Sequence, residues 1–135
     1  MLSAAAIYVI VLVVMAILDL VWISQVMGPV FQSQLSAVIS PDVNMPAAIA
    51  FYLIYPAGIT LFAVAPALKG GGWSEALLWG ALFGFFAYAT YDLTNLATLR
   101  VWSLRIALMD IAWGTFVTGA SATLAVLLAR LFRLT

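Results

Sequence analysis

The sequence predicts an all-α integral membrane protein, a four-helix bundle with a short interfacial helix between the first and second spans. Hydrophobic residues make up 67% of its 135 residues and charged residues only 7%, a balance far outside the range of soluble domains. Four apolar stretches each reach the roughly 20 residues that a helix needs to cross the hydrocarbon core of a bilayer. Each must be helical, because backbone groups facing lipid have no water to bond. By length the chain is a single domain.

The four spans are expected at residues 3–27, 46–67, 74–97 and 103–132. The first could be mistaken for a signal peptide. It has no basic segment before it and no small-residue cleavage site after it, and its apolar stretch exceeds the roughly 7–15 residues usual in signal peptides. We therefore interpret it as a retained span.

The connection between the first two spans, residues 28–45, carries the interfacial helix. Apolar residues recur there at helical spacing until Ser40 and Pro41 end the pattern, namely Val30, Phe31, Leu35, Val38 and Ile39. A short helix lying in the membrane interface fits this spacing. The other two connections are short, and their residues Trp73 and Trp102 are expected in the aromatic belts at the membrane surfaces.

Lysine and arginine counts give the predicted orientation. An even number of spans places both termini and the second connection on one side, with Lys69, Arg130 and Arg133, and leaves Arg100 and Arg105 on the other. The positive-inside rule then favours cytoplasmic termini, by three to two.

Three aspartates fall inside predicted spans at a common depth. Asp19 lies near the end of the first span, Asp92 near the end of the third and Asp110 near the start of the fourth. At ~1.5 Å per residue all three lie about 8–12 Å below one membrane surface, whichever way the protein is inserted. Charges at this depth are costly, so we expect the aspartates to face the bundle interior. Three ionised carboxylates would repel one another, so at least one is expected to be protonated or paired with a cation.

Polar and aromatic residues of the same depth complete a candidate ligand site. Arg105 is the cation proposed to balance the acids, and Trp22 and Trp113 each follow an aspartate by three residues, on the same helical face. The candidate ligand-binding residues are Asp19, Trp22, Tyr52, Tyr55, Tyr91, Asp92, Thr94, Asn95, Arg105, Asp110 and Trp113.

The composition excludes several kinds of chemistry. The chain has no His and no Cys, which removes disulfides, thiolate nucleophiles, imidazole bases and the usual haem and zinc ligands. No cofactor is expected, and a hard cation held by the aspartates and Asn95 is allowed but not demanded by the spacing. A net charge of zero without a basic run excludes nucleic-acid binding.

Several functions remain open. The site could bind or move a small amphipathic or cationic molecule or a lipid headgroup, or its polar network could be structural in an accessory or assembly subunit. Tyr91-Asp92 with Asp110 resembles the aspartate pair of intramembrane aspartyl proteases, but Leu108-Met109-Asp110 departs from their Gly-x-Gly-Asp motif. Small multidrug exporters share the four-helix architecture, but they keep a Glu near the middle of the first helix, whereas Asp19 lies far along it.

Four segments resemble a family of small bacterial inner-membrane proteins known as a domain of unknown function: "LDLVW", "FYLIYPAGI", "GALFGFFAYATYDLTNLATL" and "MDIAWG". The resemblance covers essentially the whole chain and implies a four-span, multi-pass protein of the bacterial inner membrane, surrounded by lipid. A small-molecule ligand, a second copy or another membrane subunit are the partners to be considered. The family's recurring polar positions correspond here to Asp19, Trp22, Tyr91, Asp92, Thr94, Asn95, Asp110 and Trp113.

Overall fold

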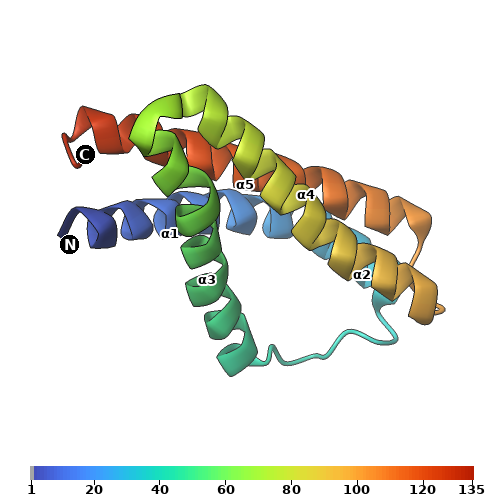
Figure 1. The fold of residues 1–135 in the computed structure, drawn as a ribbon. Coiled ribbons are helices and arrows are strands. Elements are labelled where there is room, and N and C mark those ends of the chain that lie inside the picture. Colours follow the sequence, from blue (N-terminus) through green and yellow to red (C-terminus); the bar gives the residue numbers. More distant parts are fainter. Residues whose placement is uncertain (1) are drawn as a thin grey trace.

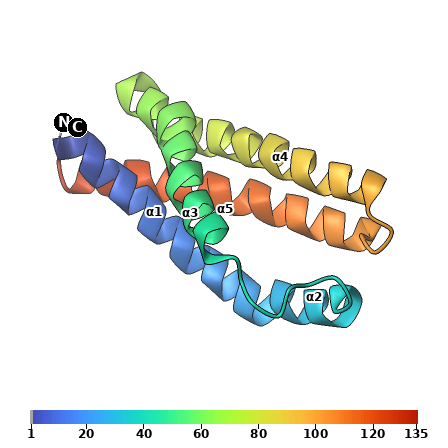
Figure 2. The same cartoon turned by 90° about the horizontal axis from the view of Figure 1, so that it is seen from below.

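The computed structural model describes residues 2–135, and its regular elements are all helical over that range. Four helices are long and apolar enough to cross a membrane, which confirms the predicted fold class. The two ends of the described chain lie close together at one end of the bundle (Figure 2), as an even number of spans requires.

The first span is a long helix with a bend. Helix α1 (Leu2–Trp22) passes through the π-helical turn η1 (Ile23–Met27) directly into α2 (Gly28–Leu35). The N–H of Gly28 donates to the carbonyl of Ile23, five residues back, and Pro29 follows at the start of α2. The expected short helix therefore forms, but it continues the first span without a break. Figure 2 shows α2 leaving the direction of α1.

The second span also contains π-helical turns. It consists of α3 (Met45–Ile59), η2 (Thr60–Val64) and η3 (Ala67–Gly71). The side chain of Asn44 caps α3 by accepting from the N–H of Ala47 at 3.2 Å. Pro56 is buried within α3 and cannot donate the usual backbone bond, and η2 begins four residues later. Figure 1 shows α3 crossing the other helices steeply.

Helices α4 (Trp73–Thr98) and α5 (Leu104–Leu131) form a closely packed antiparallel pair (Figures 1 and 2). A Cβ atom added to Gly84 would lie 2.2 Å from the carbonyl oxygen of Gly114, and one added to Gly80 would lie 2.9 Å from the Cβ of Ala122. Small residues let the two backbones approach. Gly80 and Gly84 of α4 therefore pack directly against α5 of the same chain.

The interior of the bundle is apolar toward the termini and acidic toward the other end. Near the termini, Val11, Met15, Val64 and Val126 are completely buried among α1, η2 and α5. The buried carboxylates Asp19, Asp92 and Asp110 lie beyond this core, toward the α4–α5 connection. The fold therefore concentrates its buried acids in one half.

Candidate functional site

Asp19 is the centre of a satisfied hydrogen-bond network. The hydroxyl of Tyr52 donates to Oδ2 of Asp19, and Nε1 of Trp113 donates to Oδ1 at 3.0 Å. Asp19 is only 6% exposed, so both bonds replace water in a buried setting. The carboxylate joins α1 to α3 and α5 and so fixes the relative positions of three helices.

The two tryptophans of the predicted site stack on each other. The rings of Trp22 and Trp113 have their centroids 4.6 Å apart and are parallel within 2°. Trp113 donates its hydrogen bond to Asp19 on α1, and not to Asp110 on its own helix. Nε1 of Trp22 is buried and has no hydrogen-bond partner, so this indole contributes stacking alone.

Asp92 has the opposite environment to Asp19. It is completely buried, and neither of its carboxyl oxygens has a hydrogen-bond partner. Its neighbours are the carboxyl group of Asp110 on α5 and the indole of Trp102, whose Nε1 is also buried without a partner. Two carboxylates facing each other away from water repel unless a proton or a cation comes between them.

Asp110 connects the two parts of the acidic cluster. It is 9% exposed and interacts electrostatically with both Asp92 and Asp19. The structure thus brings the three aspartates into one row from α1 through α5 to α4. Within residues 2–135 no group of three acidic side chains is arranged so that it could hold a metal ion.

An aromatic cavity opens beside this acidic row, between α3 and α4. Its volume is about 320 Å³, and its lining residues are Phe51, Tyr55, Ala87, Tyr88 and Tyr91. The hydroxyl groups of Tyr55 and Thr118 are hydrogen-bonded at 2.8 Å, which holds Tyr55 toward α5. Tyr88 lies near enough to Asp19 and Asp110 to interact with both carboxyl groups. The inner wall of the cavity therefore leads toward the acids.

Helix α2 is tied to the acidic end of the bundle. Its Gln34 accepts a hydrogen bond from the hydroxyl of Ser103 at 3.2 Å. Its Phe31 packs on Trp102 with ring centroids 5.9 Å apart. The bend at η1 thus carries α2 to the segment that joins α4 to α5, next to Asp92.

Three residues of the predicted site lie at its margin. Thr94 is exposed, and its hydroxyl donates to the carbonyls of Thr90 and Tyr91 on its own helix. Arg105 is also exposed, because α5 turns this side chain away from the buried Asp110. Asn95 is half-buried, one helical turn after Tyr91.

The structure adds residues that the sequence reading did not place in the site. Trp102 was expected only as an interfacial anchor, yet its indole lies beside Asp92. Phe51 and Tyr88 line the aromatic cavity, and Thr118 bonds Tyr55. Phe51 could have been found, because it precedes Tyr55 by four residues and so shares its helical face. The contact between Thr118 and Tyr55 depends on how α3 crosses α5, so no pattern in the neighbouring sequence predicts it.

Four apolar helices around a buried acidic cluster define a multi-pass integral membrane protein. Residues 4–127 match a family described as "Predicted membrane protein (DUF2177)", and the chain belongs to that family. No curated protein and no solved structure matches the chain.

Proposed function

We propose that this protein binds a small amphipathic organic cation in the aromatic cavity between α3 and α4. The cation enters from the surrounding lipid and neutralises the acidic row behind Tyr88. Exchange of the cation for a proton at these aspartates would make the protein a transporter. In this proposal the site is a binding site, and no residue is assigned a catalytic role.

The observation that carries the proposal is the buried, unpartnered carboxyl group of Asp92, which follows Tyr91, a lining residue of the aromatic cavity, on α4. A buried carboxylate without a hydrogen bond or counter-ion is destabilising, so a group that brings positive charge to Asp92 stabilises the protein. Aromatic faces attract cations, most strongly where water is excluded. Phe51, Tyr55, Tyr88 and Tyr91 offer four such rings within one cavity.

We also propose the inner membrane of a bacterium as the location, with both termini in the cytoplasm. The charge count around the spans supports this orientation, with Lys69, Arg130 and Arg133 at the terminal end of the bundle. The acidic row then lies in the outer half of the membrane. A ligand would reach it from the outer leaflet or the outside solution.

The proposal is tested with phenyltrimethylammonium and its neutral isostere tert-butylbenzene. Wild type and Asp92→Asn are purified in mild detergent, and native mass spectrometry records bound mass while thermal unfolding is followed in parallel. We expect wild type to bind the cation and not the isostere, and an equally stable Asp92→Asn to bind neither. Equal binding of the cation by both proteins would contradict a role for Asp92.

A second candidate function rests on Asp19. Its two hydrogen bonds tie α1, α3 and α5 together, as expected for an accessory or assembly subunit whose polar network is structural. Under this alternative wild type binds no cation, and Asp19→Asn unfolds at a much lower temperature, because breaking a buried network at one partner typically costs several kcal/mol. Binding of phenyltrimethylammonium by wild type therefore separates the two candidates.

A further inference from the structure

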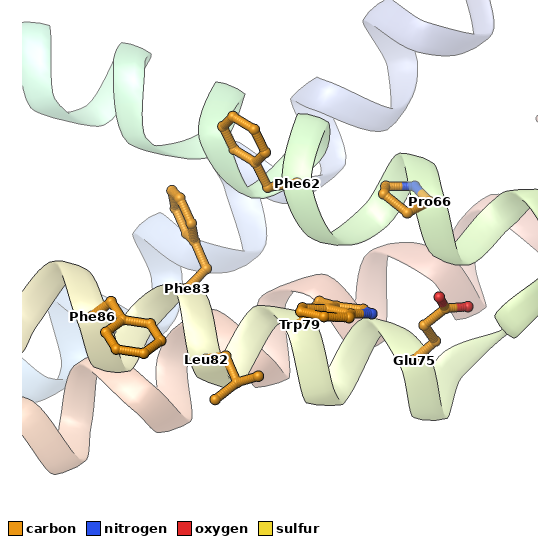
Figure 3. Close-up of a pocket in the computed structure, with 7 residues that line it drawn as sticks. All are labelled: Phe62, Pro66, Glu75, Trp79, Leu82, Phe83 and Phe86. Atoms are coloured by element: carbon orange, nitrogen blue, oxygen red, sulfur yellow. The ribbon is translucent and has the colours of Figure 1, made fainter.

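A second, larger cavity lies along the α4 side of the second span, toward the termini (Figure 3). It has a volume of about 700 Å³, and six of its seven lining residues are apolar or aromatic, among them Phe62, Trp79, Leu82 and Phe86. The seventh is Glu75. We refer to this cavity as the α4 groove.

The α4 groove is separate from the aromatic cavity. Phe83 stands between the two, stacked on Tyr55 with centroids 5.5 Å apart and on Phe62 with centroids 5.7 Å apart. Gly58 leaves room for this ring, because a Cβ there would lie 2.8 Å from its Cζ. A ligand of the groove therefore need not touch the acidic row.

The dimensions of the groove match one leaflet of a bilayer. It follows α4 from Glu75, in the first turn, to Phe86. These positions are about 16 Å apart along the helix at ~1.5 Å per residue. The hydrocarbon core is about 30 Å thick, so the groove extends from one membrane surface to about the midplane.

Charged side chains mark the surface end of the groove. Glu75 is half-buried there, and Figure 3 shows its carboxylate beside the Trp79 ring and Pro66. The guanidinium of Arg130 lies next to Gly72 in the preceding turn, where an added Cβ would be 3.4 Å from Nη1. A carboxylate and a guanidinium at one end of an apolar groove complement an ammonium group and a phosphate on one molecule.

We propose that the α4 groove binds a phospholipid whose headgroup carries an ammonium group. One acyl chain lies along Trp79, Leu82 and Phe86 toward the midplane, the headgroup ammonium pairs with Glu75, and the phosphate faces Arg130. This surface is surrounded by lipid, so the apolar lining alone would accept the acyl chain of any phospholipid. The charges of Glu75 and Arg130 select the headgroup.

The experiment compares two tryptophan variants on adjacent turns of α4. Leu78 and Leu82 are both exposed, but only Leu82 lines the groove. Wild type, Leu82→Trp and Leu78→Trp are transferred to nanodiscs containing equal amounts of phosphatidylethanolamine and phosphatidylglycerol with identical acyl chains. Native mass spectrometry after release then counts the retained lipids.

We expect wild type and Leu78→Trp to retain one phosphatidylethanolamine and Leu82→Trp to retain at least tenfold less. Equal retention by the two variants would overturn the groove as the site. Glu75→Gln changes no volume and should retain both lipids alike, so an unchanged preference in this variant would overturn the headgroup assignment. Binding of phenyltrimethylammonium by Leu82→Trp should match wild type, which separates this test from that of the aromatic cavity.

Discussion

At the scale of single residues, the two acids at the ends of the row have opposite environments. Asp19 receives a hydrogen bond on each oxygen, whereas Asp92 receives none. A buried hydrogen bond stabilises modestly, while a buried polar group without a partner costs its full desolvation. Asp19 therefore contributes to stability, whereas burial of the unpartnered Asp92 reduces it.

The stacked pair Trp22 and Trp113 permits a matched test of the Asp19 network. Replacing either by Phe removes a similar ring area, but only Trp113→Phe removes a hydrogen bond to Asp19. We expect Trp113→Phe to lower the free energy of unfolding by about 1–3 kcal/mol more than Trp22→Phe. Reversible unfolding in mixed detergent, followed by circular dichroism, measures the difference. Equal losses would mean that the Trp113 bond adds nothing to stability.

At the scale of helices, the π-helical turns make the first two spans depart from straight rods. Pro29 and Pro56 each lack the N–H that a regular helix uses. The turn η1 precedes Pro29, and η2 follows Pro56. The first turn carries α2 to the α4–α5 connection, and the second accompanies the steep crossing of α3. Both adjustments shape the surroundings of the acidic row.

Gly28 is required by the geometry of η1. A Cβ atom there would lie 2.5 Å from the carbonyl oxygen of Ile23, a backbone atom that cannot move without changing the turn. Gly28→Ala should therefore destabilise the protein by about 1–3 kcal/mol, as overpacking does. Gly70→Ala is the control, because nothing lies within 4 Å of the added atom. Thermal unfolding of both variants in one detergent gives the comparison, and equal midpoints would show that η1 tolerates a side chain.

The α4–α5 contact depends on Gly84 in the same way. Its added Cβ would meet the carbonyl oxygen of Gly114 at 2.2 Å, whereas at Gly119 the nearest atom is a side-chain carbon 3.3 Å away. We expect Gly84→Ala to separate the helices and cost about 3 kcal/mol, and Gly119→Ala to cost less than about 1 kcal/mol. Steric trapping or detergent unfolding measures both values, and a reversed order would contradict this packing.

The parts of the structure that sequence could predict are those set by local pattern. Hydrophobic length gives four spans, and chain parity brings Asp19, Asp92 and Asp110 to one level. The π turns were not predicted, because Pro56 alone does not say whether a helix kinks or changes register. The difference between the chemical environments of Asp19 and Asp92 could not be predicted either. It depends on which helix meets the indole of Trp113 and on the burial of Trp102, both properties of the assembled bundle.

At the scale of the whole molecule, orientation decides which solution the acidic row can reach. The bias of three positive residues to two is small, so the positive-inside rule favours one direction of insertion over the other only weakly. Because the chain has no Cys, single cysteines report orientation without background. Ser40, in the connection between α2 and α3, and Gly70, in the last turn of η3, are both exposed and lie at opposite ends of the bundle.

We expect a membrane-impermeant maleimide to label Ser40→Cys and not Gly70→Cys in intact cells, and to label both after lysis. This pattern follows if the termini are cytoplasmic, because Gly70 shares their side and Ser40 does not. Labelling of Gly70→Cys alone would place the acidic row in the inner half of the membrane and make the cytoplasm the source of its ligand. Labelling of both in intact cells would show dual insertion, as the small charge bias permits. The cavity would then face one leaflet in some copies of the protein and the other leaflet in the rest.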